Sequence, residues 1–221
     1  MADFAIESRL WEQGYRFVAG VDEAGRGPLA GPLVVAAVIL PRDWAEPVEL
    51  DDSKRLSPAQ REAAFPAIRR RAVSWRVVVV PPGEIDRVNI LRATLAAMAR
   101  AVERLKPGVD FVLVDGNRAP EPPPRRCPCE LLVGGDGLSA SIAAASILAK
   151  VVRDRLMGVY GRRYPQWGFD RHKGYGTRAH RDAIARHGPS PIHRRSFRPG
   201  GMAWAEWETG SEAAPDEMAS P

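Results

Sequence analysis

Short apolar runs alternate along the chain with longer segments in which apolar residues recur at helical spacing. Five runs have the length and the content of Val, Ile, Leu and Phe that are typical of buried strands. The predicted strands cover residues 17–22, 33–40, 73–80, 111–114 and 131–133. The third run is followed by Pro81 and Pro82, which stop a strand because proline cannot donate to a sheet.

Four longer segments predict helices, and two of them carry clear start signals. Ser57 followed by Pro58 is a typical helix start, with serine as the N-cap and proline at the first helical position. Thr177 has the same capping role before the last of these segments. The predicted helices cover residues 58–71, 91–105, 139–157 and 177–188. Before them, residues 1–14 form an amphipathic lead-in whose packing residues are Phe4, Leu10 and Trp11.

The turn between the first two strands carries two adjacent carboxylates and three glycines. Asp22 and Glu23 come at the end of the first strand, and glycines follow at positions 25, 27 and 31. Carboxylates at the end of a buried strand cost free energy unless a cation receives them, and divalent metal ions prefer oxygen ligands. Asp and Glu before glycine are also typical of a solvated turn, so both interpretations stay open on this stretch alone.

A second strand also ends in an aspartate. Residues 111–114 lead directly into Asp115. If this strand lies parallel and adjacent to the first, Asp115 and Asp22 emerge at the same edge of the sheet, where open α/β sheets bind ligands. Asp136 comes just before the predicted helix 139–157. It is either a favourable charge near a helix N-terminus or a further metal ligand.

Charge is distributed unevenly along the chain. The net charge of the 221 residues is +5, but residues 150–198 alone contain thirteen Lys and Arg and three Asp. This concentration predicts a polyanionic partner, most often a nucleic acid, with a basic solvated face as the alternative. After residue 199 the chain has Asp and Glu but neither Lys nor Arg. We expect this acidic tail to be disordered.

Length and composition exclude several classes of protein. A chain of 221 residues forms one domain with a small appendage at most. The longest apolar run, residues 33–40, is too short to span a bilayer, and no signal peptide is visible, so a cytoplasmic location is expected. Cys127 and Cys129 are expected to be loop thiols, because a zinc site needs wider spacing and further ligands. The glycines fit neither the Walker nor the dinucleotide-binding pattern.

Seven blocks of residues together carry a family likeness. They are residues 18–29, 52–57, 89–94, 114–118, 141–154, 172–177 and 193–197. The first reads Val-Ala-Gly-Val-Asp-Glu-Ala-Gly-Arg-Gly-Pro-Leu, and the sixth reads His-Lys-Gly-Tyr-Gly-Thr. In this order the blocks resemble bacterial ribonuclease HII, of the type 2 ribonuclease H family. The likeness covers about residues 10 to 200 and leaves the acidic tail outside.

The resemblance implies an α/β protein with a ribonuclease H-like fold, in which a mixed five-stranded sheet is flanked by helices and followed by a small helical C-terminal part. In these terms, residues 1–160 form the catalytic domain, 161–200 a basic helical part packed on it, and 201–221 the acidic tail. The implied activity is an endoribonuclease that hydrolyses the RNA strand of RNA–DNA hybrids and cuts at ribonucleotides embedded in duplex DNA, leaving 5′-phosphomonoesters. The partners are then nucleic acids, with no membrane, and a monomer is expected.

The family uses four acids, which correspond here to Asp22, Glu23, Asp115 and Asp136. They are expected to bind two Mn²⁺ or Mg²⁺ ions roughly 4 Å apart, which activate a water and stabilise the leaving oxygen. In a regular strand Asp22 and Glu23 point to opposite faces, so we expect the chain to bend directly after Asp22. Asp154 is expected to form a surface ion pair beside Arg153.

Further residues inherit roles in binding the substrate. The backbone of Gly25, Arg26 and Gly27 is expected to meet the ribonucleotide 2′-OH, the group that distinguishes RNA from DNA. Tyr175 matches the tyrosine that reads the junction between a ribonucleotide and a deoxyribonucleotide; without the family it would be taken for a core or surface tyrosine. Phosphate contacts position a duplex without reading its sequence. The candidates for these contacts are Ser53, Lys54, Lys150, Arg194 and Arg195.

Three alternatives compete with this interpretation. The first is the sister enzyme ribonuclease HIII, which carries an added N-terminal domain and lacks this Gly-Arg-Gly form of the loop. The second is a nucleic-acid-binding module without catalysis, although binding alone does not favour carboxylates near phosphates. The third is a metal-dependent phosphatase acting on small substrates, against which the basic segment indicates a longer polyanion.

Overall fold

The computed structural model, which describes residues 1–121 and 127–197, is built on a five-stranded sheet. The strands are β1 (Val18–Ala24), β2 (Leu33–Ile39), β3 (Ser74–Val80), β4 (Phe111–Asp115) and β5 (Cys129–Leu132). In space they follow the order β3-β2-β1-β4-β5. β1 pairs antiparallel with β2 and parallel with β4, so the predicted mixed sheet and the parallel pairing of the two strands that end in acids are confirmed.

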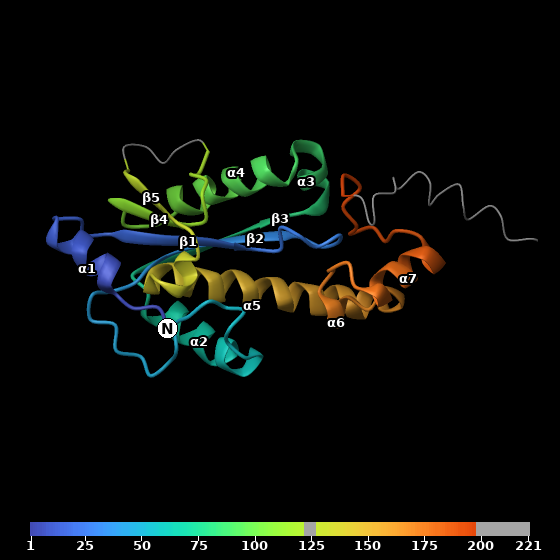
Figure 1. Cartoon of the computed structure of the whole chain (residues 1–221), viewed down its shortest axis with the longest axis horizontal. Coiled ribbons are helices and arrows are strands. Elements are labelled where there is room, and N and C mark those ends of the chain that lie inside the picture. The colour runs from blue at the N-terminus through green and yellow to red at the C-terminus, as the bar shows by residue number, and fades with distance from the viewer. Residues whose placement is uncertain (122–126, 198–221) are drawn as a thin grey trace, which may run out of the picture.

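Helices cover both faces of the sheet, as Figure 1 shows. In chain order they are α1 (Ala5–Glu12), α2 (Pro58–Arg71), α3 (Pro82–Val88), α4 (Ile90–Glu103), α5 (Ala140–Arg163), α6 (Phe169–His172) and α7 (Arg178–His187). α3 and α4 lie on one face, α2 and α5 on the other, and α6 and α7 continue from the far end of α5. The chain therefore has the α/β architecture that the sequence predicts.

β2 is buried on both faces because its side chains alternate between two cores. Val34, Ala36 and Val38 pack with the apolar residues of α2 and α5. Their neighbours Val35 and Ala37 pack with those of α4. Because paired residues of adjacent strands share a face of the sheet, this alternation also determines which face each residue of β1 lies on.

The long helix α5 lies directly on β1 because the strand has no side chain at Gly20. A Cβ placed there would come within 2.1 Å of the carbonyl carbon of Ser141 and 2.2 Å of the nitrogen of Ile142. This close approach needs glycine, since any side chain would push the helix away. It brings the first turns of α5 next to the residues that follow Gly20 in β1.

The predicted helix starts are confirmed in detail. Ser57 caps α2 through a capping box with Gln60, and the Thr177 hydroxyl accepts from the backbone N–H of His180 at the start of α7. Two helices, α3 and α6, were not predicted. Pro81 and Pro82 were read only as a strand stop, whereas they also begin α3, because proline fits the first helical turn. α6 has four residues, too few for a helical period to show.

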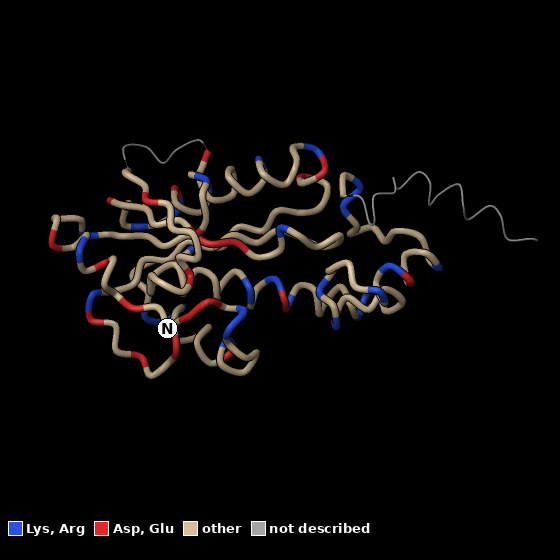
Figure 2. The backbone as a smooth tube through the Cα atoms, viewed as in Figure 1, with Lys and Arg blue, Asp and Glu red and all other residues tan. Residues whose placement is uncertain are grey.

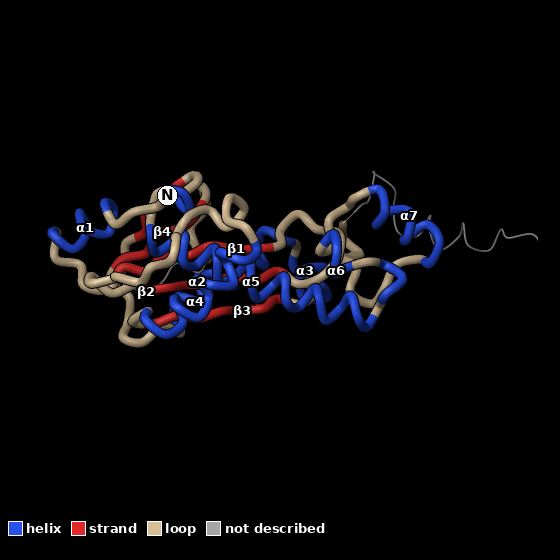
Figure 3. The backbone as a smooth tube through the Cα atoms, turned by 90° about the horizontal axis from the view of Figure 1, so that it is seen from below, coloured by secondary structure: helices blue, strands red, loops and turns tan. Residues whose placement is uncertain are grey.

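The C-terminal end of the described chain has a small core of its own. Met157, Trp167, Phe169 and Ile184 pack together between α5, α6 and α7. Figure 3 shows this part extending beyond the end of the sheet, and Figure 2 shows Lys and Arg gathered along it. Cys127 and Cys129 are free thiols, the second at the start of β5. Within the described residues no helix is both long and apolar enough to cross a membrane. The expected acidic tail lies outside them.

Candidate active site

Three carboxylates from distant parts of the sequence meet at one edge of the sheet. Asp22 lies in β1, Asp115 ends the parallel neighbour β4, and Asp136 lies in the short turn before α5. One ligand oxygen from each lies within 4.8 Å of the others. The pairing of Val21 with Val114 places the two strand aspartates at equivalent positions of adjacent strands. The expectation that both would emerge at one sheet edge is met by this geometry.

Backbone N–H groups hold two of these carboxylates in place. The Asp22 Oδ1 accepts from the N–H of Glu23 at 2.6 Å. The Asp115 Oδ1 accepts from the N–H of Gly135 at 2.8 Å. A Cβ on Gly135 would lie 2.9 Å from the Cβ of Leu132 and 2.7 Å from Cδ1 of Ile142, so glycine favours the close approach of this turn to Asp115. The cluster is thus built by close backbone contacts.

Two carboxylates of the cluster, those of Asp22 and Asp136, have raised pKa values. Burial raises the pKa of Asp22 well above its ordinary value, and the charges of Glu23 and Asp115 raise it further. Burial, followed by the charges of Asp115 and Asp52, raises the pKa of Asp136 to about 6, while Lys54 opposes this shift. A site that concentrates negative charge in this way is relieved by a bound cation, which favours the ionised oxygens.

Glu23 lies on the other face of the sheet. β1 continues to Ala24 in regular register with β2, so the expected bend directly after Asp22 is wrong. Glu23 pairs with Val35, whose side chain packs toward α4. Among the described residues, the cluster of close carboxylates consists of Asp22, Asp115 and Asp136 and does not include Glu23.

The Glu23 carboxylate still interacts with Asp115, one member of the cluster. It lines a small pocket of about 80 Å³ together with Arg26, Thr94 and Asp115. Arg26 Nη1 lies 3.4 Å from its Oε1. Burial raises the pKa of Glu23; Arg26 opposes this rise, and the charge of Asp115 adds to it. Asp115, at the end of its strand, therefore stands between the cluster and the Glu23 pocket.

Ser53 and Lys54 lie beside the cluster in different surroundings. The Ser53 side chain is buried, and its Oγ accepts from Ser146 Oγ at 2.9 Å, so it offers little surface to a phosphate. The Lys54 Nζ lies 3.9 Å from both Asp136 Oδ2 and Asp52 Oδ1 and is largely exposed. Partial burial alone would lower the pKa of Lys54, but Asp52, Asp136 and the strand carboxylates raise it above its ordinary value.

Hydrogen bonds from Arg194 hold the backbone of the Gly-Arg-Gly loop from its buried side. This side chain is fully buried. Its guanidinium donates to the carbonyl oxygens of Gly25 at 2.6 Å, Arg26 at 2.9 Å and Gly31 at 3.0 Å. The prediction that Arg194 contacts phosphate is corrected by this geometry, because its donors face inward. Its neighbour Arg195 is exposed, with a backbone N–H that donates to Asp86 Oδ2 at 2.9 Å.

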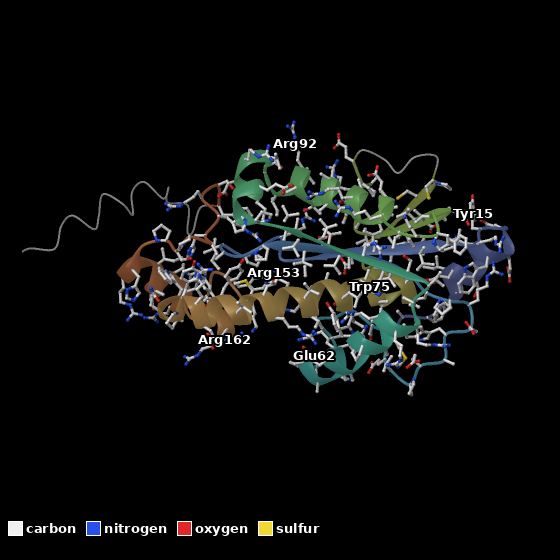
Figure 4. The ribbon with its side chains drawn as sticks, turned by 180° about the vertical axis from the view of Figure 1, so that it is seen from behind. Tyr15, Glu62, Trp75, Arg92, Arg153 and Arg162 are labelled. Carbon is white, nitrogen blue, oxygen red and sulfur yellow. The ribbon has the colours of Figure 1, made fainter. Side chains whose placement is uncertain are left out.

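A second buried arginine joins the loops on either side of the site. Arg153 donates to the carbonyls of Pro32 at 3.0 Å, Ala30 at 3.3 Å and Lys173 at 2.9 Å, and Figure 4 shows it between α5 and the sheet. Arg153 is therefore turned away from solvent, whereas its neighbour Asp154 forms the expected ion pair with another residue. The partner of Asp154 is Lys150, whose Nζ lies 2.8 Å from Asp154 Oδ1, one helical turn earlier.

Tyr175 projects from the loop that Arg153 holds. Its side chain is 46% exposed, and the Arg153 guanidinium carbon lies 5.9 Å from its ring centroid. The carbonyl of the preceding Gly174 accepts from the N–H of Leu29 at 2.9 Å. The tyrosine loop and the Gly-Arg-Gly loop are therefore bonded to each other, with Arg26, Gly27 and the Tyr175 ring at the surface.

Comparison with known proteins identifies the family. The family model described as Ribonuclease HII matches residues 19–199. The chain belongs to the ribonuclease HII family. A ribonuclease HII of Syntrophotalea carbinolica is 55% identical over 193 residues, which cover 87% of this chain and 90% of that protein. The ribonuclease HIII alternative is set aside by these matches.

Solved structures agree on the fold. The ribonuclease H2 of Pyrococcus horikoshii has a TM-score of 0.74 and 27% identity, over 90% of this chain and all of that one (100%). A Bst ribonuclease HIII solved in complex with Mn²⁺ has a TM-score of 0.69 and 20% identity, over 89% of this chain and 70% of that one. As a member of the ribonuclease HII family, the chain is a metal-dependent endoribonuclease acting on RNA–DNA hybrids.

Sequence reasoning missed the two buried arginines and Ser146. Arg194 was predicted to contact phosphate and Arg153 was given no role of its own, although both donate to loop carbonyls. Ser146 was not singled out, yet its hydroxyl donates to Ser53 at 2.9 Å and lowers the pKa of Asp22 against the effect of burial. Its sequence signal was a serine among alanines on the buried side of a helix, since a polar residue at such a place needs a partner.

Proposed function

We propose that Asp22, Glu23, Asp115 and Asp136 bind two divalent ions, Mn²⁺ or Mg²⁺, and that the enzyme uses them to hydrolyse the RNA strand. The observation that carries this proposal is the group of three carboxylates with oxygens within 4.8 Å of one another. Three acids so placed, two of them buried, repel one another unless cations lie between them. The donor set is all oxygen, which suits hard divalent ions.

The position of each acid gives it a role. Asp22, Asp115 and Asp136 form the carboxylate cluster, and Glu23 approaches Asp115 from the α4 side, where both line one small pocket. Asp115, placed between them, is the residue able to serve both sides of the sheet edge. When bound, the two ions supply activation of the attacking water and charge stabilisation for the leaving 3′-oxygen. The product is then a 5′-phosphomonoester, and no histidine or lysine is needed as nucleophile.

We further propose that the enzyme cuts at ribonucleotides embedded in duplex DNA. Gly25 is buried, whereas Arg26 and Gly27 are exposed at the tip of the loop predicted to meet a 2′-OH, and Tyr175 stands at the surface of the adjoining loop. Lys54 and Arg195 are exposed cations that suit phosphate contacts. Lys150 keeps part of its surface, although Asp154 neutralises its charge. Phosphates would fix the register of the duplex without selecting a base sequence.

The test is cleavage of two matched DNA duplexes, one with a single ribonucleotide and one without. With Mn²⁺ or Mg²⁺ the enzyme is expected to cut the first and spare the second, and a chelator should stop the reaction. Asp22→Asn and Asp115→Asn should abolish cleavage but still bind the duplex. Asp43→Asn, which removes an exposed carboxylate outside the cluster, is the control. Near-normal turnover by either cluster variant would contradict the mechanism.

A further inference from the structure

Three of the four histidines in the chain gather beneath the loop that carries Tyr175. His172 and His180 stack with ring centroids 4.2 Å apart, and His193 follows with its centroid 5.1 Å from that of His180. His180 and His193 are almost fully buried, at 0% and 2% exposure. The ring of Phe169 lies against this histidine network at 5.5 Å from His180. The proposed hydrolysis gives these imidazoles no chemical role.

The hydrogen bonds of the network determine where each proton lies. The backbone N–H of Ser190 donates to His193 Nδ1 at 2.7 Å, so the proton of a neutral His193 is on Nε2. That Nε2 faces His180 Nε2 at 3.0 Å and donates to it. His180 must then carry its own proton on Nδ1, which donates to the carbonyl of Tyr175 at 2.9 Å. Each ring accepts on one side and donates on the other.

The same logic keeps both rings uncharged. A second proton on either ring would place two N–H donors opposite each other across the 3.0 Å contact, or a donor against Ser190. Burial, with the nearby His172, lowers the pKa of His180 to about 4. Burial, with the nearby His180, lowers the pKa of His193 to about 3. The donor to Tyr175 is thus fixed in one tautomer at neutral pH.

The network ends on the backbone of Tyr175. The Tyr175 carbonyl accepts from His180 and also from the N–H of Thr177 at 2.8 Å, while its own N–H donates to the carbonyl of His172 at 3.0 Å. Both peptide groups of this residue are therefore fixed from the buried side. The ring, by contrast, is half exposed and meets solvent. Such an arrangement sets the position of a surface ring through a buried scaffold.

The network also reaches the Gly-Arg-Gly loop. His193 forms an isolated antiparallel bridge with Ala30, and the N–H of Gly31 donates to the carbonyl of Ile192 at 2.9 Å. One chain of bonds therefore runs from the loop after Gly27, through His193 and His180, to Tyr175. The two surfaces assigned to the ribonucleotide share this support.

We propose that His180, held in its donor tautomer by His193, is a positioning residue that sets Tyr175 for cleavage at a single embedded ribonucleotide. This inference rests on the proposed function and deepens it. The histidine network touches Tyr175 through its backbone, so it acts on the geometry of the tyrosine and leaves the metal-binding acids unchanged.

Two substitutions at one position test this proposal. In His180→Asn the amide nitrogen falls near the place of Nδ1 and keeps the bond to the Tyr175 carbonyl. In His180→Gln the longer side chain places its amide near Nε2, so it faces His193 and loses the bond to Tyr175. His187→Gln, at an exposed histidine of the same helix, is the control. The measurements are kcat and KM on a DNA duplex with one ribonucleotide, duplex binding in EDTA by fluorescence anisotropy, and the melting temperature.

We expect His180→Gln to lose about fivefold in kcat, the effect of one hydrogen bond of ordinary strength, with binding in EDTA unchanged. His180→Asn and His187→Gln should keep the wild-type kcat. Equal losses in the Asn and Gln variants, or losses that only follow the melting temperature, would overturn the positioning role. Wild-type enzyme that cuts neither this duplex nor an RNA–DNA hybrid would overturn the proposed function instead. Undiminished cleavage by Tyr175→Ala would remove the target of the positioning and overturn this inference alone.

Discussion

Arg194→Lys distinguishes a buried scaffold residue from a phosphate contact. At a phosphate contact lysine replaces arginine well, because both act as a positive charge. At position 194 the guanidinium spans three carbonyls, those of Gly25, Arg26 and Gly31, which a single ammonium group cannot reach together. We therefore expect a large loss of stability together with a misshapen Gly-Arg-Gly loop.

The magnitude follows from the bonds lost. A hydrogen bond to a charged group contributes about 1.5–3 kcal/mol, and lysine keeps at least one of the three. The loss of one or two bonds lowers the free energy of unfolding by about 2–5 kcal/mol, which for a chain of this size lowers the melting temperature by roughly 5–15 °C. Urea unfolding and thermal melting measure both quantities.

The matched control is Arg195→Lys, at the exposed neighbour. It should leave stability unchanged and keep the salt dependence of duplex binding, since the charge is retained. If Arg194→Lys proved as stable as Arg195→Lys, while cleaving with wild-type kcat and KM, the scaffold role would be refuted. A loss confined to duplex affinity, with stability intact, would restore the phosphate contact that the sequence predicts for Arg194.

Three further predictions concern the metal-free protein. Asp22→Asn should raise the melting temperature of the metal-free protein, because burial and neighbouring charges raise the pKa of Asp22 and so disfavour its ionised form in the fold. The same substitution should weaken the stabilisation that Mn²⁺ gives. A variant that Mn²⁺ stabilises as well as wild type would contradict this prediction. As the pH is lowered from 6.5, the free energy of unfolding should decrease by up to about 1.4 kcal/mol per pH unit for each of His180 and His193. The reason is that the unfolded chain binds protons that the folded rings, with pKa values of about 4 and about 3, do not bind. Urea midpoints at pH 7 and pH 5 check this prediction, and equal midpoints would count against the neutral network. Gly20→Ala should prevent normal folding, because its Cβ would meet the backbone of Ser141 at 2.1 Å, and a native circular dichroism spectrum and melting curve would show that α5 can move away.

The sheet and two of its acids could be predicted because strand patterns are local. Asp22 and Asp115 each follow a run of apolar residues, and parallel neighbours bring such strand ends together. Asp136 was harder, since a charge before a helix has a structural reason of its own. Its approach to Asp115 depends on the tight turn at Gly135, which no pattern of hydrophobic residues records.

Adjacent identical residues mark the limit of sequence reasoning. Arg194 and Arg195 look alike in sequence, yet one is buried and the other exposed, because the bond from the N–H of Arg194 to the carbonyl of Leu29 fixes which side faces inward. Asp154 shows the reverse case. Residues adjacent in a helix point in different directions, so the spacing rule favours Lys150 over Arg153 as its partner, and that rule was available from the sequence.

Anomalous X-ray scattering from a crystal soaked in Mn²⁺ tests the central claim most directly. The account predicts one manganese peak bounded by Asp22, Asp115 and Asp136, and a second on the side where Glu23 approaches Asp115. Peaks elsewhere, with these carboxylates making no contact to manganese, would contradict it.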